Sequence, residues 1–137
     1  MKISEKDIVE IAELLDCGMI CYYHRTNGSI ESYPDPESDF FDPEPWQDVI
    51  DKVKKDKKNY LDFEKIDSNR AFEIMENFAH SQSDTAFKNQ LFDRLSNRKP
   101  FQNFQSLVDS SAYREDWFDF KKKSNIDYVK HQLELKD

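Results

Sequence analysis

Hydrophobic positions near the start of the chain follow first a helical and then a strand-like period. Four of them fall on one helical face: Ile8, Ile11, Ala12 and Leu15. Ser4 and Asp7 resemble a capping box, so the pattern predicts a helix over residues 4–15. The two apolar runs that come next, GMICYYHR and SIESYP, are joined by TNGS. Because Asn-Gly tolerates the positive φ of tight turns, these runs predict a β-hairpin.

An acidic stretch, DPESDFFDPE, separates this hairpin from a second helical pattern. Asp42 before Pro43 is a good N-cap and first-turn pair, which predicts a loop that opens a helix over residues 43–57. That helix is expected to bury four side chains: Trp46, Val49, Ile50 and Val53. The run NYLDFEK predicts an added strand with Leu61 and Phe63 on one face.

From Ser68 onward the hydrophobic pattern is helical throughout. Phe72, Met75 and Phe78 mark one helix, and a second carries Phe87, Leu91 and Leu95 beyond the polar turn HSQSD. Pro100 ends the second helix and starts a short third. In the tail the phase slips between two apolar sets, Tyr113, Trp117, Phe120 and then Ile126, Val129, Leu133. One kinked helix and two short helices both fit this tail.

These elements predict an α+β fold, in which an N-terminal helix and a β-hairpin with a third strand pack against a mainly helical C-terminal half. At 137 residues the chain suits a single domain over residues 1–137. Only 37% of the residues are hydrophobic, but eleven Phe, six Tyr and two Trp place that material in large side chains. We therefore expect an aromatic core that joins the two halves through Trp46, Phe72, Phe78, Phe101 and Trp117.

The charge and composition exclude several classes of function. The formal net charge of −8 opposes nucleic acid as a general partner. No apolar run approaches the ~20 residues of a membrane span, and MKISEKDIVE does not resemble a signal peptide, so we expect no membrane association and a cytoplasmic location. With only two glycines and no glycine-flanked Ser, phosphate-cradling loops are excluded and a non-catalytic domain is favoured over an enzyme.

The acidic stretch 35–44 is the first candidate site. Its alternating carboxylates resemble the start of a calcium loop, but Phe40 replaces the required glycine and Trp46 the bidentate glutamate. An acidic rim beside exposed aromatic rings, with no cation in the loop, suits a basic segment of a partner protein. The alternative is that Phe40 and Phe41 pack as a staple before the helix. The protein-binding hypothesis takes in Asp35, Glu37, Asp39, Phe40, Phe41, Asp42 and Glu44.

Two further groups contain metal-binding residue types. Cys17, Cys21 and His24 are soft ligands, but on a strand the cysteines share one face and His24 takes the other. We expect two reduced strand cysteines in the core.

The other group is a stripe on one predicted helix, Glu73, Glu76 and His80, which equally suits a solvated face. A metal bundle would need matching ligands from other helices, and only His131 and Glu134 offer them. We therefore expect no cofactor and no bound metal.

The stretch LSNRKPFQNF, residues 95–104, interleaves cations with aromatic side chains, as single-stranded nucleic-acid binders do. Helical spacing turns Phe101 and Phe104 toward the interior, which predicts that both rings are buried. Arg94, Arg98 and Lys99 then lie near a helix C-terminus, where cations are stabilising. The alternative is a ligand-binding basic corner, formed by these three cations.

Several stretches together resemble one known family: YYHRTNGSIESYP, FEIMENFA, Arg98 to Phe104 continuing to Leu107, and Trp117 with Phe120. They resemble uncharacterised protein family 0158, small bacterial proteins with no assigned activity, over nearly the whole chain. The resemblance implies a shared fold and brings no catalytic residues with it.

Our first functional interpretation is an acidic protein-binding or adaptor module of otherwise unknown function. The second is a nucleic-acid-associated regulator that uses Arg94, Arg98, Lys99 and the run Lys121 to Lys123. The third is a metal-dependent hydrolase built around Glu73, Glu76 and His80. The sequence leaves the oligomeric state open.

Overall fold

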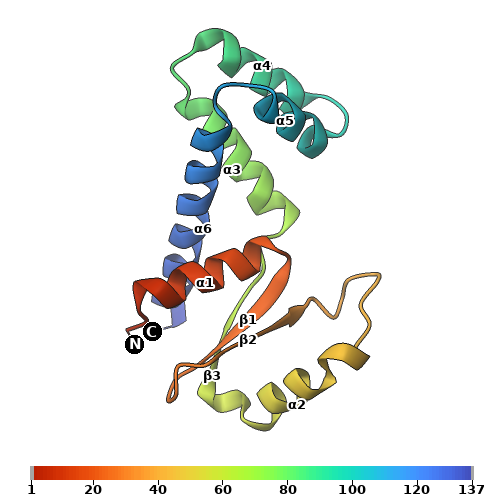
Figure 1. Ribbon diagram of the computed structural model, residues 1–137, viewed down its shortest axis with the longest axis vertical. Helices are drawn as coiled ribbons and strands as arrows, with labels where there is room; N and C mark the ends of the chain where they lie inside the picture. The colour runs from red at the N-terminus through yellow and green to blue at the C-terminus, as the bar shows by residue number, and fades with distance from the viewer. Residues whose placement is uncertain (1, 137) are drawn as a thin grey trace. The chain divides into compact units, whose positions relative to one another are not determined.

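A computed structural model describes residues 2–136 and has the predicted α+β architecture (Figure 1). Its elements, with short 3-10 helices labelled η, are α1 (Glu5–Asp16), β1 (Met19–His24), β2 (Ile30–Pro34), η1 (Glu44–Trp46), α2 (Gln47–Lys55), η2 (Lys57–Asn59), β3 (Tyr60–Phe63), α3 (Ser68–Ser81), α4 (Thr85–Ser96), α5 (Pro100–Asp109) and α6 (Arg114–Lys136). Within residues 2–136, no helix combines the length and apolar character needed to span a membrane.

The chain divides into two compact units, and each has a core of its own. The first unit runs up to Ile66 and resumes at Asn125, and the second is Asp67–Ser124. Helix α6 therefore contributes to both units. A single domain over the whole chain stays a prediction.

The first unit contains a three-stranded antiparallel sheet in the order β2-β1-β3. The hairpin between β1 and β2 confirms the prediction from Asn27 and Gly28, although only Gly28 takes a positive φ, of 74°. Asn27 instead accepts a hydrogen bond on its side-chain oxygen from the Ser29 N–H at 2.9 Å. The predicted third strand is β3, on the other side of β1.

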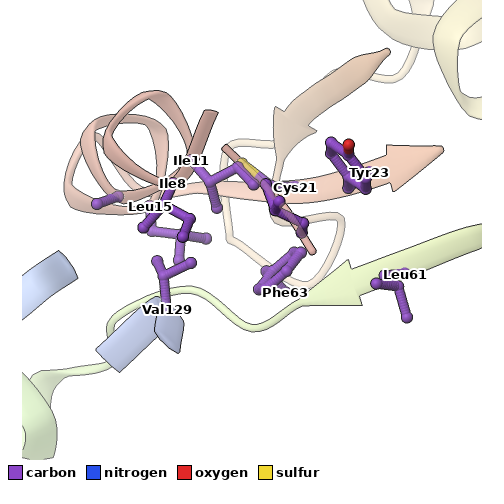
Figure 2. Close-up of a cluster of buried hydrophobic side chains, with 10 residues drawn as sticks. Ile8, Ile11, Leu15, Cys21, Tyr23, Leu61, Phe63 and Val129 are labelled. Atoms are coloured by element: carbon purple, nitrogen blue, oxygen red, sulfur yellow. The ribbon is translucent and has the colours of Figure 1, made fainter. Parts of the chain in front are cut away.

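One face of this sheet packs against α1. Cys21 and Tyr23 of β1 lie opposite Phe63 and Leu61 of β3, so these four side chains share a face. They belong to one buried cluster with the apolar side of α1 and Val129 of α6, and Figure 2 shows Cys21 and Phe63 nearest to the side chains of α1. Ser4 caps α1 by accepting a hydrogen bond from the Asp7 N–H at 3.2 Å, as the capping pattern predicted.

The core of the second unit is aromatic. Phe78, Phe104 and Trp117 are buried, and the Trp117 ring centroid lies 5.2 Å from that of Phe78 and 5.0 Å from that of Phe104. They form a cluster with side chains of α3, α4 and α5 in the same unit. Trp46, which we expected in one shared core with them, belongs to the first unit and is only half-buried.

The prediction that Phe101 is buried is wrong, because 43% of this residue is exposed. The buried side of α5 is set by Phe104 and Val108, four residues apart, and Phe101 sits in the first helical turn beyond the end of that stripe. Its ring keeps one edge contact, with Phe72 at 6.2 Å between centroids.

The tail forms one continuous 23-residue helix, α6, with no break. The slip in its apolar phase has a packing explanation. Trp117 and Phe120 pack in the core of the second unit, whereas Ile126, Val129 and Leu133 pack in the core of the first.

Two local predictions also need correction. Cys17 is the exposed C-cap of α1 and does not belong to a strand, because Gly18 follows with φ 85° and ends the helix there. The helix predicted over 43–57 begins as the 3-10 turn η1, in which the Trp46 N–H donates to the Pro43 carbonyl at 2.9 Å. Its α-helical part, α2, ends at Lys55.

Candidate functional site

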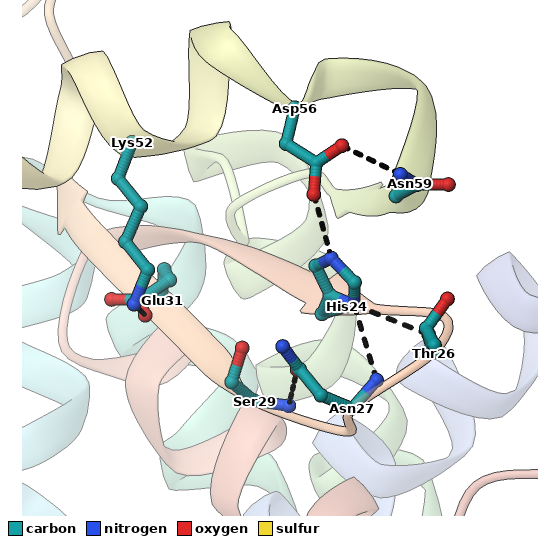
Figure 3. Close-up of polar contacts among 8 residues, drawn as sticks. All are labelled: His24, Thr26, Asn27, Ser29, Glu31, Lys52, Asp56 and Asn59. Atoms are coloured by element: carbon teal, nitrogen blue, oxygen red, sulfur yellow. Dashed lines mark hydrogen bonds and ion pairs between the residues drawn. The ribbon is translucent and has the colours of Figure 1, made fainter.

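The best-organised polar group in the first unit surrounds His24, on the sheet face opposite α1 (Figure 3). Sequence reasoning had placed His24 only in a soft-metal group. Its side chain is buried, and Nε2 lies 2.8 Å from the Oδ2 of Asp56, which follows the end of α2. The His24 ring also packs edge-on against Tyr60, with 4.8 Å between ring centroids.

The hydrogen bonds around His24 fix its tautomer. Nδ1 faces two backbone donors of the hairpin turn, the N–H of Thr26 at 3.2 Å and that of Asn27 at 3.1 Å. An atom that accepts two hydrogen bonds carries the lone pair, so the proton is on Nε2 and is donated to Asp56. This bond, together with one from Asn59, holds the pKa of Asp56 below its usual value.

This geometry joins α2 to the hairpin turn and leaves the ring no free nitrogen. A general base needs an unoccupied lone pair within reach of a substrate proton. His24 has none, because backbone amides occupy Nδ1 and Asp56 accepts the proton of Nε2. The hollow beside it, of about 430 Å³, is also lined by Lys52, whose Nζ lies 2.7 Å from Glu31. We therefore interpret the contact between His24 and Asp56 as structural: it holds the end of α2 to the hairpin turn, and we call it the clasp.

The acidic loop, residues 35–44, is shaped by its own turns. The Glu37 N–H donates to the Asp35 Oδ1 at 3.0 Å, and the Glu44 N–H donates to the Asp42 Oδ1 at 3.1 Å. Asp35 also pairs with Lys65 at 2.7 Å, which holds the pKa of its carboxyl below the usual value. The loop sequence contains no cation, but the folded chain brings Lys65, from outside the loop, next to Asp35.

The aromatic residues in and after the acidic loop differ in how far they are exposed to solvent. Phe40 is 98% exposed, so the alternative in which it packs as a staple is wrong for this residue. Phe41 is half-buried, and so is Trp46 at the end of the following turn. Phe40 is therefore exposed to solvent. In the sequence, the acidic residues Asp39 and Asp42 flank the pair formed by Phe40 and Phe41.

The basic corner, defined as Arg94, Arg98 and Lys99, lies where α4 passes into α5. All three side chains are exposed, and Lys99 has the left-handed φ of 52° that turns the chain into Pro100. A hollow of about 400 Å³ lies beside Arg94, and its other lining residues are uncharged: Asn97, residues of α5 and the C-cap of that helix, Ser110. Arg94 also pairs with Asp93 at 3.4 Å.

The stripe Glu73, Glu76 and His80 gathers no further ligands. Glu73 accepts a hydrogen bond from Arg70 at 3.2 Å, and His80 packs edge-on against Phe92, with 4.8 Å between ring centroids. His131 and Glu134 belong to the other unit and are exposed. Across residues 2–136, no three His, Cys, Asp or Glu side chains form a group able to hold a metal ion.

The two cysteines have different environments. Both thiols are free, Cys17 exposed and Cys21 buried. Burial, with a smaller contribution from Glu10, raises the pKa of the Cys21 thiol to about 12. Cys21 is therefore an inert core residue rather than a ligand or nucleophile.

The clasp of His24 and Asp56 was missed from the sequence. Its members are 32 residues apart, and neither stands in a motif that would link them. The only local signal was a His directly before the turn residues RTNG, where a ring can accept from turn amides.

Comparison with known proteins identifies a family. The model of an Uncharacterised protein family (UPF0158) matches residues 8–137, nearly the whole chain, which confirms the resemblance seen in the sequence. No curated protein and no solved structure matches the chain.

Proposed function

Because the chain belongs to the Uncharacterised protein family (UPF0158), whose description names no activity, we propose a function from the geometry: the protein binds a basic segment of another protein through the acidic loop. In this role it acts as a protein-binding or adaptor module. The partner is defined by its chemistry, an exposed segment rich in Lys or Arg.

The proposal depends on one observation, the exposure of Phe40 among carboxylates. A ring that is 98% exposed gains no stability from folding and makes apolar area available to a partner. Burial of such a ring on binding is typical of the anchor residues that dominate interface energies. The aliphatic stem of a Lys or Arg can cover the ring while its charged end reaches a carboxylate.

The charges around this ring support a basic partner. Asp35 is already neutralised by Lys65, so the carboxylates available to a partner are those of Glu37, Asp39, Asp42 and Glu44. The turn bonds of the acidic loop hold its backbone in a defined shape before binding. A preformed loop loses less conformational entropy on association than a flexible one.

Fluorescence anisotropy with a labelled peptide of alternating Lys and Val tests the proposal, and a Glu-Val peptide serves as the control probe. Two triple variants are compared, each of which removes three negative charges. The loop variant carries Glu37→Gln, Asp39→Asn and Glu44→Gln, and the control variant carries Glu115→Gln, Asp116→Asn and Asp119→Asn on α6. The loop variant keeps Asp35 and Asp42, whose side chains shape the turns.

We expect the loop variant to weaken binding about tenfold, roughly 1.4 kcal/mol, and Phe40→Ala to weaken it by a similar factor. The control variant should reduce binding only slightly, and less at physiological than at low ionic strength. Equal losses in the two triple variants would show a response to net charge alone and would contradict the proposal. Unchanged affinity in Phe40→Ala would remove the ring from the interface.

A second function is supported by the exposure of Phe101 next to the basic corner. An aromatic ring that is 43% exposed, directly after Arg98, Lys99 and Pro100, suits stacking with a base of single-stranded nucleic acid. We propose this regulator role as the alternative. Anisotropy with a labelled single-stranded oligonucleotide at low salt tests it, with Phe101→Ala expected to weaken binding about tenfold. Absence of binding at low salt would contradict it, since phosphate contacts are strongest there.

A further inference from the structure

The two outer edges of the sheet in the first unit differ in whether a side chain pairs with their outward backbone groups. Beyond β3, the side-chain amide of Gln132 on α6 pairs with the backbone of Glu64: its Oε1 accepts from the Glu64 N–H at 2.8 Å, and its Nε2 donates to the Glu64 carbonyl at 3.2 Å. Gln132 is only 7% exposed. This amide occupies the outer side of the chain just after β3, as a neighbouring strand would.

The outer edge of β2 has no such cover among the described residues. The His24 N–H donates to the Ser29 carbonyl, so residues of β2 alternate from that bonded pair. Glu31 and Tyr33 therefore direct their backbone groups toward β1, and Ile30 and Ser32 direct theirs outward. Within residues 2–136, β2 pairs with β1 alone, and no backbone or side-chain group occupies the outward N–H of Ile30 or Ser32.

We propose that the outer edge of β2 accepts an extended basic segment of a partner protein as a fourth strand. The backbone N–H and carbonyl groups of Ile30 and Ser32 would pair with that segment, and Pro34, which has no N–H, limits the pairing at the end of the strand. Strand addition supplies affinity through main-chain hydrogen bonds and leaves specificity to the side chains.

The charge of the occupant follows from what adjoins this edge. The chain passes directly from Pro34 into the acidic loop, so Glu37 and Asp39 follow the end of this edge within five residues along the chain, and the one carboxylate within β2, Glu31, is already paired with Lys52. A second copy of the chain is a poor occupant, since each carries a net charge of −8 and its own acidic loop. This inference rests on the proposed function, because it takes the charge of the partner from the acidic loop.

Ser32→Pro is the central test, because proline removes one outward N–H and takes no hydrogen bond from the pairing of β2 with β1. Ser32→Ala is its matched control, which removes the hydroxyl and keeps the N–H. Binding of the Lys-Val peptide is measured for both by anisotropy, and circular dichroism verifies that each is folded. A version of the peptide that is N-methylated along its backbone keeps its charge but cannot pair as a strand, and it is measured on the unaltered protein.

We expect Ser32→Pro to weaken binding at least tenfold, Ser32→Ala less than twofold, and the N-methylated peptide to bind at least tenfold more weakly than its parent. Equal binding of the two peptides overturns the proposal, and that result holds even if Ser32→Pro does not fold. If the loop triple variant weakens binding while folded Ser32→Pro does not, the acidic loop is the site and strand addition is wrong. If only Ser32→Pro weakens binding, the edge is the site and the loop proposal fails. A dimer of the unaltered protein in sedimentation that Ser32→Pro converts to monomer would identify a second copy as the occupant and overturn the proposal.

Discussion

Truncation of Phe104 should destabilise the second unit more than truncation of Phe101, three residues earlier in the same helix. Phe104 is fully buried and contacts the rings of Phe78 and Trp117. Removal of a ring that buries ~150–200 Å² at about 25 cal/mol per Å² costs roughly 4 kcal/mol, within the ~3–5 kcal/mol typical of Phe→Ala in a core. Phe101 is 43% exposed, so the same arithmetic on its buried part gives only about 2–3 kcal/mol for its truncation.

The measurement is urea unfolding of Phe104→Ala and Phe101→Ala, followed by tryptophan fluorescence. The chain has two tryptophans, Trp46 in the first unit and Trp117 in the second. In a Trp46→Phe background the signal comes from Trp117 alone and reports the unit that both substitutions affect. Circular dichroism at the same urea concentrations shows whether the helices unfold in the same transition.

The reasoning is refuted if the two variants lose the same free energy of unfolding. Equal large losses would mean that the Phe101 ring is packed as the helical spacing first predicted, and would leave no exposed ring for stacking with a base. Equal small losses would mean that Phe104 does not lie in the core at all.

Four further predictions concern the clasp, the thiols and the sheet edge. His24→Ala should lower the free energy of unfolding, measured in urea, by about 2–3 kcal/mol, because the amides of Thr26 and Asn27 lose their acceptor. A loss near zero would show that water replaces the ring as the acceptor. The pKa of Asp56 is lowered in the folded state, so the stabilisation that its carboxylate provides is complete above its unfolded pKa of about 4 and is lost as the pH falls below that value. The difference in melting temperature between the unaltered protein and Asp56→Asn should therefore shrink as the pH is lowered. A constant difference would contradict this. Cys17 should react with a thiol reagent in the native protein and Cys21 only after unfolding, and two fast equivalents would contradict the burial of Cys21. Gln132→Ala should lower the free energy of unfolding, measured in urea, by about 1–3 kcal/mol, because it leaves the backbone of Glu64 unpaired. Gln132→Glu should lower it further, because it places an acceptor-only carboxylate against the Glu64 carbonyl at a buried position, and a milder loss for Gln132→Glu would contradict this pairing.

The sequence alone determined the elements whose signals are local. Ser4 caps the first helix, Gly28 turns the hairpin and Pro100 opens α5, because each acts on backbone groups within a few residues of itself. The apolar periods located the strands and helices for the same reason. The family resemblance rested on particular stretches such as YYHRTNGSIESYP and FEIMENFA, and it was confirmed over residues 8–137.

Tertiary structure decided which side chains meet. Gln132 reaches Glu64 across 68 residues, and Lys65 neutralises a carboxylate of the acidic loop that is itself free of cations. It also decided that α6 serves two cores, which is why its apolar phase slips, and that Phe101 stays exposed while Phe104 is buried. Periodicity records only which face of an element is apolar; where that face ends against its neighbours, and which distant polar group lies opposite, depends on how the elements pack.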